Sequence, residues 1–83
     1  MELKNFAFAP KTLTVAPGTT VVWTNGDSAA HTVTADDGSF DSGNMNQGAT
    51  FKFTFTKAGA FAYYCMYHGG KGGVGMSGQI IVK

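Results

Sequence analysis

The stretch that decides the fold class is Thr50-Phe51-Lys52-Phe53-Thr54-Phe55-Thr56, in which phenylalanine alternates with polar residues. This period of two is typical of a β-strand that buries one face and exposes the other. The turn residues Lys57-Ala58-Gly59 follow, and the next apolar run, residues 61–65, predicts a second strand. We expect the two strands to pair as a hairpin.

The rest of the chain has the same character. Turn clusters rich in Gly, Pro, Asn and Asp separate short runs of β-branched and aromatic residues, and these turns recur about every ten residues. No stretch shows the apolar spacing of an amphipathic helix without a Gly, Pro or turn cluster inside it. The sequence therefore predicts an all-β protein of about seven short strands with no substantial helix, arranged as a sandwich or a small barrel. The five further strand candidates are residues 5–8, 12–15, 19–23, 31–34 and 79–82. The expected core residues are Trp23, Phe51, Phe53, Phe55 and Phe61, and Met45 and Met66 are expected to pack inside as well.

Length and charge exclude several classes of protein. A chain of 83 residues has room for one core, so we expect residues 1–83 to form a single domain. Six lysines, no arginine and five acidic residues give a formal charge of +1, and the dispersed lysines exclude a nucleic-acid-binding surface. No apolar run approaches the ~20 residues of a membrane span, and no leader is recognisable, so we expect a soluble protein.

The possible metal ligands gather in one stretch, Tyr63-Tyr64-Cys65-Met66-Tyr67-His68, and just beyond it. Cys65, the only cysteine, ends a predicted strand, and His68 follows in a glycine-rich loop that Met76 closes. His31, the only other histidine, begins a predicted strand. Two histidines, a cysteine and a methionine are the ligands of a trigonal copper site with a long axial thioether. Zinc is a weaker candidate, because structural zinc sites prefer several thiolates.

This ligand set predicts a protein that is not an enzyme but an electron carrier, in which one copper ion per chain cycles between Cu(I) and Cu(II). The alternative function is copper binding for delivery, storage or sensing, in which the metal itself is exchanged. Catalysis is disfavoured, because Cys65 and a histidine could act as nucleophile and base but no third, orienting residue is evident.

Three segments carry a resemblance to a known family. Residues 31–43 are similar to the segment with the family's first histidine, residues 47–55 to the strand before its cysteine, and residues 63–68 and 76–82 to its ligand loop and last strand. On these segments the chain resembles the cupredoxins, which are small type 1 blue copper proteins, and most closely their plastocyanin, amicyanin and pseudoazurin-like members. The resemblance implies a Greek-key β-sandwich with copper near one end. It also implies that His31, Cys65 and His68 are equatorial ligands and that Met76 is the axial ligand.

Two positions depart from the family pattern. Seven residues separate His68 from Met76, which is more than plastocyanins and amicyanins usually have, so Met66 stays open as an alternative axial ligand. Thr32 follows His31 where plastocyanins commonly place Asn. The sequence leaves open whether Thr32 supplies the supporting side-chain hydrogen bond at this position.

The resemblance also bears on partners and location. We expect a monomer that docks transiently on redox partner proteins near His68, where neighbouring glycines let a partner approach the imidazole. Tyr64 matches the surface aromatic of the plastocyanin docking patch, to which Asp36, Asp37 and Asp41 could belong, although a solvated turn explains these aspartates equally well. The family implies a periplasmic, thylakoid-lumenal or otherwise extracytoplasmic location, with neither leader nor anchor in residues 1–83.

Overall fold

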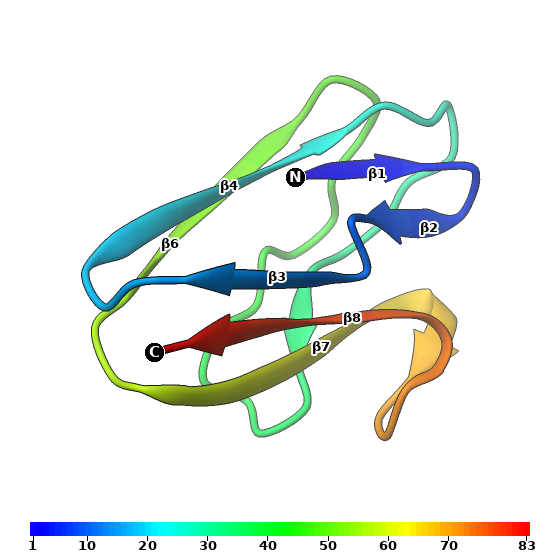
Figure 1. Ribbon diagram of the computed structural model, residues 1–83. Helices are drawn as coiled ribbons and strands as arrows, with labels where there is room; N and C mark the ends of the chain where they lie inside the picture. The colour runs from blue at the N-terminus through cyan, green and yellow to red at the C-terminus, as the bar shows by residue number, and fades with distance from the viewer.

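The computed structural model describes all 83 residues as two four-stranded sheets with no helix (Figure 1). One sheet has the strand order β2-β1-β4-β6 and the other the order β3-β8-β7-β5. The strands are β1 (Glu2–Lys4), β2 (Ala7–Ala9), β3 (Thr12–Val15), β4 (Thr19–Asn25), β5 (Thr34–Ala35), β6 (Thr50–Phe55), β7 (Gly59–Gly70) and β8 (Val74–Val82). The predicted all-β sandwich is confirmed, with eight strands instead of about seven. The additional strand is β1, which is too short and too polar to show a clear alternation.

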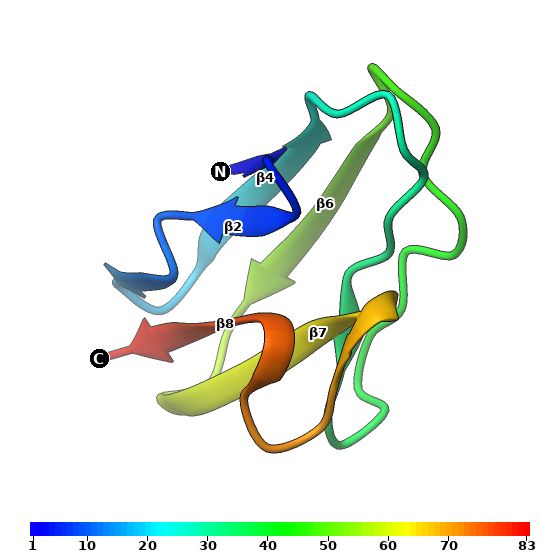
Figure 2. The same ribbon diagram turned by 90° about the vertical axis from the view of Figure 1, so that its right-hand side faces the viewer.

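The predicted hairpin of residues 50–56 and 61–65 is wrong. β6 pairs antiparallel with β4, whereas β7 pairs with β8 and β5 in the other sheet. The chain therefore changes sheets between β6 and β7 (Figure 2). A period of two identifies a strand but not its neighbour, and a short connection can serve as a sandwich corner as well as a hairpin turn.

Two other strand candidates differ from the structure at the end near the metal-ligand candidates. Asn5 and Phe6 form the turn between β1 and β2 with φ angles of 54° and 56°, so the strand begins only at Ala7. His31 makes an isolated bridge with Met45, and β5 is reduced to Thr34–Ala35. The segment from His31 to Ala35 is nevertheless buried throughout, which explains its apolar, strand-like pattern.

The core lies between the two sheets and is built largely from aromatic rings. Trp23 and Phe55 are fully buried as expected, with the Trp23 ring 5.4 Å from that of Tyr63. The predicted core residues Phe51, Phe53 and Phe61 are only partly buried against this cluster. Of the two methionines expected to pack inside, Met45 is buried, but the prediction for Met66 is wrong, because 53% of its surface is exposed. Successive residues of a strand point to opposite faces, so an inward Cys65 turns Met66 outward.

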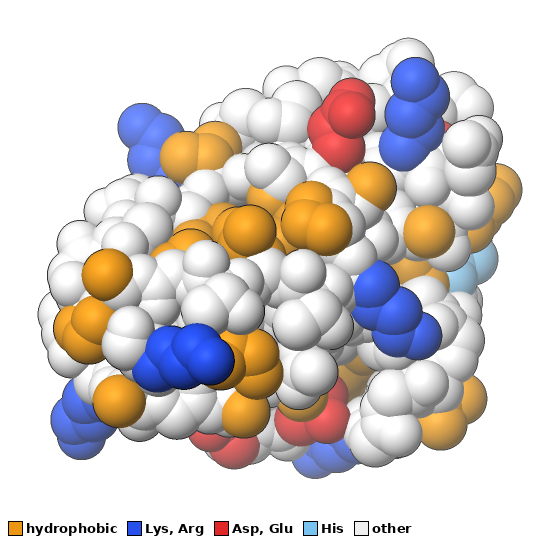
Figure 3. Space-filling view, in the orientation of Figure 1, with side chains coloured by type: hydrophobic (Ala, Val, Ile, Leu, Met, Phe, Trp, Pro, Cys, Tyr) orange, Lys and Arg blue, Asp and Glu red, His pale blue; other side chains and the backbone are white.

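The glycine-rich segment after His68, predicted as a loop, instead continues the ladder between β7 and β8. Gly69 pairs with Gly75 and Gly70 with Val74, after a register shift between Tyr64 and Gly69. The tip of this hairpin, coloured yellow to orange, curls away from the rest of its sheet (Figure 1). The structure contains no helix with the length and apolar character needed to cross a membrane. On the face shown in Figure 3 the lysines are scattered and form no single patch.

Tyr63 gives the fold a measurable sensitivity to alkaline pH. Burial raises the pKa of the Tyr63 phenol to about 12, above its usual value of about 10. A raised pKa means that stability is complete below about pH 10 and is lost as the pH rises toward about 12, because only the unfolded state releases the proton in this window. Between about pH 9 and about pH 11 the wild-type protein should lose about 1 kcal/mol more free energy of unfolding than the Tyr63→Phe variant. Urea unfolding of both proteins at the two pH values measures the difference, and equal losses would contradict it.

Candidate metal centre

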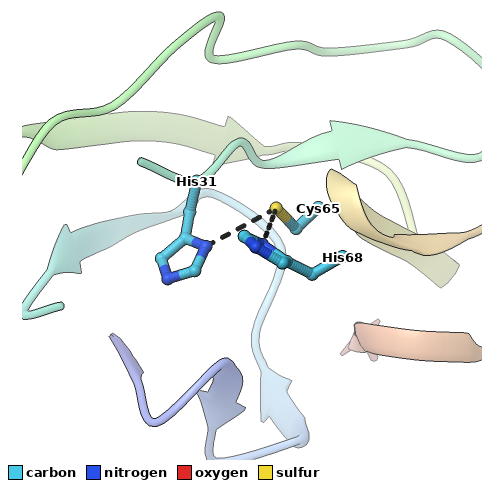
Figure 4. A group of neighbouring side chains, drawn as sticks. All are labelled: His31, Cys65 and His68. Carbon is cyan, nitrogen blue, oxygen red and sulfur yellow. Dashed lines mark hydrogen bonds between the residues drawn. The ribbon is translucent and has the colours of Figure 1, made fainter. Parts of the chain in front are cut away.

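Three potential metal ligands converge at one end of the sandwich. The donor atoms of His31, Cys65 and His68 all lie within 4.8 Å of one another. The Nδ1 atoms of both histidines point at the sulfur of Cys65, each at a distance of 3.6 Å (Figure 4). Such spacing fits two donors that are each ~2.0–2.3 Å from a common ion. The structure thus brings together the three residues predicted from the sequence as equatorial ligands.

The local structure of β7 explains how Cys65 and His68 reach the same point. The register shift between Tyr64 and Gly69 interrupts the ladder with β8 at this place. Irregularities of this kind re-aim side chains that a regular strand would send to alternating faces. As a result Cys65 is fully buried while His68 is exposed, and His31 on the neighbouring segment is fully buried.

Asp27 holds the outer nitrogen of His31. Its Oδ2 lies 2.8 Å from His31 Nε2, and its carboxylate also accepts hydrogen bonds from the backbone N–H groups of Asn5 and Phe6. The pKa of Asp27 lies below its usual value. The largest cause is the hydrogen bond from the backbone N–H of Phe6, and the hydrogen bonds from His31 and Asn5 add to it. A carboxylate can only accept, so Nε2 carries the proton and Nδ1 presents its lone pair toward Cys65.

The loop that carries Asp27 is itself held by a buried side chain. Asn25, at the end of β4, donates from Nδ2 to the carbonyl oxygens of Ala29 and Met45 and accepts a hydrogen bond from the backbone N–H of Asp27. It is completely buried, so these bonds face little competition from water. Asn25 therefore fixes the direction from which the carboxylate of Asp27 approaches the His31 ring.

Thr32 makes the supporting side-chain hydrogen bond that the sequence left open. Its hydroxyl accepts a hydrogen bond from the backbone N–H of Met66 at 2.9 Å and lies 2.9 Å from the hydroxyl of Thr34. Thr32 is fully buried and thereby ties the segment after His31 to the strand that carries Cys65. A hydroxyl supplies the support for which plastocyanins commonly use an amide.

The two methionine candidates have different surroundings. Met76 lies in β8 and is only 4% exposed, whereas Met66 is half exposed on the outer face of β7. The backbone of Met76 packs directly against Gly69, the residue after His68. These observations favour Met76 over Met66 as a residue close to the other donors.

The exposed edge of the site is apolar. His68 is exposed, and the ring of Phe6 packs edge-on against it with a centroid distance of 4.7 Å. Phe6, Met66 and Tyr67 are each 53% exposed. Figure 3 shows histidine atoms reaching the surface beside hydrophobic side chains.

The aspartates considered as a docking patch each accept a hydrogen bond from a backbone N–H. Asp36 accepts the backbone N–H of Gly72, and Asp41 that of Gly43. Asp37 accepts the backbone N–H of Ser39, and hydrogen bonds from Ser39 hold its pKa below the usual value. The contacts of Asp37 and Asp41, each two residues along the chain, support their interpretation as turn residues. Asp36 instead ties its segment to the tip of the β7–β8 hairpin.

Sequence reasoning missed Asp27 and Phe6. Asp27 lies four residues before His31 in the stretch Asn25-Gly26-Asp27-Ser28, whose composition indicates only a turn. Phe6 is separated from Asp27 by 21 residues and contacts His68 only because a turn with positive φ angles brings it there. The short spacing of Asp27 and His31 is the one sequence signal that indicates either residue.

A buried thiol and two imidazoles at one end of a two-sheet sandwich define a cupredoxin. The chain belongs to the plastocyanin/azurin family of copper binding proteins, whose pattern matches residues 1–83. The resemblance to this family is therefore confirmed. Together with the cluster of His31, Cys65 and His68, family membership identifies the cofactor as copper, one ion per chain.

Individual relatives agree with this assignment. The chain is 39% identical to halocyanin from Natronomonas pharaonis, over 94% of this chain and 49% of the relative. It is 36% identical to chloroplastic plastocyanin from Chlamydomonas reinhardtii, over 92% of this chain and 58% of the relative. A purple cupredoxin from Nitrosopumilus maritimus has a TM-score of 0.80 and 29% identity, over 93% of this chain and 82% of that chain. The chain thus spans about half the length of the two relatives.

Proposed function

We propose that this protein transfers electrons between redox partner proteins through a mononuclear type 1 copper centre that cycles between Cu(I) and Cu(II). His31, Cys65 and His68 are the equatorial ligands and Met76 is the axial ligand. The observation that carries the proposal is the convergence of both Nδ1 atoms on the sulfur of Cys65. A bound copper ion supplies the one-electron redox step, and the donor types suit both oxidation states.

The surroundings of the donors support electron transfer. Cys65 and His31 are fully buried, and Asp27 and Thr32 hold the segments around them. Ligands that are held in place move little when the copper changes oxidation state, and this lowers the reorganisation energy of electron transfer. His68 alone is exposed, and its apolar surroundings offer a surface for transient docking of a redox partner.

We propose that the protein acts as a carrier and not as an enzyme. The two surface hollows of the molecule are lined by other residues, and neither includes His31, Cys65 or His68. The site therefore has no adjoining pocket for a substrate.

We propose that residues 1–83 act as a single monomeric domain in an extracytoplasmic setting, as the family resemblance implies.

Copper titration tests the proposed function. Addition of Cu(II) to the apoprotein should produce an intense visible thiolate-to-copper band that saturates at one ion per chain, with the paramagnetic-resonance spectrum of a type 1 site. Copper bound without this band would contradict the proposal.

The exposed His68 also makes copper delivery a second candidate, since an incoming ligand can reach the ion from this side. Slow electron self-exchange together with ready transfer of copper to a chelator would favour delivery.

Replacement of Met76 by Leu tests the axial assignment. The three equatorial donors survive, so the visible band should remain. Loss of a weak donor to Cu(II) should raise the reduction potential, by about 59 mV for each tenfold loss of preference for Cu(II) over Cu(I). Redox titration measures the shift, and Met66→Leu is the matched control, with an expected potential close to that of the wild type. The reverse pattern would assign the axial position to Met66.

A further inference from the structure

Asp27 is placed to act on the metal centre without touching the metal. Its carboxylate makes three short contacts, to His31 Nε2 at 2.8 Å, to the backbone nitrogen of Asn5 at 2.8 Å and to that of Phe6 at 3.0 Å. The side chain of Asp27 is only 14% exposed and that of His31 not at all. The imidazole is therefore shielded from solvent, whereas the carboxylate lies close to the surface.

We propose that Asp27 is a positioning residue that lowers the reduction potential of the copper centre by holding the Nε2 proton of His31. The inference rests on the proposed function, because it requires His31 to be a ligand through Nδ1. A carboxylate that accepts the outer N–H of a ligating imidazole fixes the tautomer and raises the basicity of the inner nitrogen. A more basic nitrogen and a nearby negative charge both favour Cu(II) over Cu(I).

Asp27 has a second connection to the site, through Phe6. The backbone N–H groups that Asp27 accepts belong to the two turn residues with positive φ, Asn5 and Phe6. This turn presents the Phe6 ring to both imidazoles, at 5.5 Å from His31 and 4.7 Å from His68. The ring shields the exposed edge of the site from water, and a drier site disfavours the more highly charged oxidised form.

The carboxylate of Asp27 and the ring of Phe6 have opposite effects on the reduction potential, so the sign of the change distinguishes them. Loss of the carboxylate charge should raise the potential, because Cu(II) loses stabilisation. Loss of the Phe6 ring should lower it, because water reaches the site. If Asp27 only held the turn, its replacement would release Phe6 and lower the potential as well.

The experiment compares copper-loaded Asp27→Asn, Phe6→Ala and Asp37→Asn with the wild type by redox titration of the visible band. Asp37→Asn is the matched control, because Asp37 is exposed and also accepts a backbone N–H, but it contacts neither histidine. In Asp27→Asn we expect Cu(II) affinity to fall ~10–100-fold, as is typical for partners of a ligating histidine, and Cu(I) affinity to fall less. The potential should therefore rise, while that of Phe6→Ala falls and that of Asp37→Asn stays at the wild-type value.

The outcomes distinguish this inference from the proposed function. If wild-type protein gives no thiolate-to-copper band, the function proposed above is wrong. If the band is normal but Asp27→Asn has the wild-type potential or a lower one, only the role of Asp27 is overturned.

A measurement on the wild type covers the case in which Asp27→Asn does not fold. In the Cu(I)-loaded protein the Nε2–H of His31 should give a nuclear magnetic resonance signal shifted strongly downfield, because the proton is donated to a carboxylate, an effect that burial alone does not produce. A signal at the ordinary position of an imidazole N–H would overturn the inference.

Discussion

Replacement of Cys65 by Ser is expected to abolish the visible absorption band of the copper-loaded protein and to weaken copper binding strongly. The band requires a thiolate, and a serine hydroxyl stays protonated and lacks the softness that favours Cu(I). Loss of a direct donor should reduce Cu(I) affinity by more than the ~10–100-fold that is typical of losing an outer partner of a ligand. Visible spectroscopy and competition with a Cu(I) chelator measure the two effects.

Cys65→Ser should leave the fold intact, so that loss of the band reports loss of the ligand and not unfolding. Ser and Cys are nearly equal in shape, and Cys65 is fully buried at the edge of the core. The apoprotein should therefore unfold cooperatively, and its circular dichroism should match that of the wild type. A band that persisted in Cys65→Ser would exclude Cys65 as the ligand. If the wild type hydrolysed a model ester and this variant did not, the proposal of a non-enzymatic carrier would need revision.

The sequence predicts strands well because a strand is a local pattern. The alternation of Phe51, Phe53 and Phe55 depends only on which face is buried, and the structure confirms a strand there. Its partner is a non-local property. β6 pairs with β4, some thirty residues earlier in the chain, because the Val21 and Trp23 face of β4 supplies the matching surface.

The three converging donors were predictable for a different reason. Cysteine and histidine are rare in this chain, so their types alone limit the possible sites. The supporting residues carry no such signal. Thr32 and Asp27 are common turn and strand residues whose roles follow from hydrogen bonds to Met66, His31 and the first turn. Phe6 reaches His68 through a turn in which Asn5 and Phe6 both adopt positive φ, a conformation that Asn tolerates but a bulky residue such as Phe rarely adopts.

Replacement of Gly69 by Ala should disrupt the end of the β7–β8 ladder that carries His68 and Met76. A Cβ at Gly69 would collide with the backbone oxygen of Met76 and would lie 2.8 Å from the Met76 nitrogen and the Val74 oxygen. All three are backbone atoms, so no side chain can rotate away, and β8 itself must move. We expect the free energy of unfolding to fall by about 3 kcal/mol, the upper end of ordinary overpacking effects. We also expect the copper spectrum to change, because the displaced backbone adjoins two proposed ligands.

Gly72→Ala is the matched control at the tip of the same hairpin. Gly72 has a positive φ of 82°, unlike Gly69, but a Cβ there would meet nothing within 4 Å. Its replacement should cost only about 1 kcal/mol, from the left-handed backbone alone, and should leave the copper spectrum unchanged. Urea unfolding of the apoproteins and visible spectra of the loaded proteins compare the two variants. Equal stabilities and equal spectra would show that the close approach at Gly69 does not hold His68 and Met76 in place.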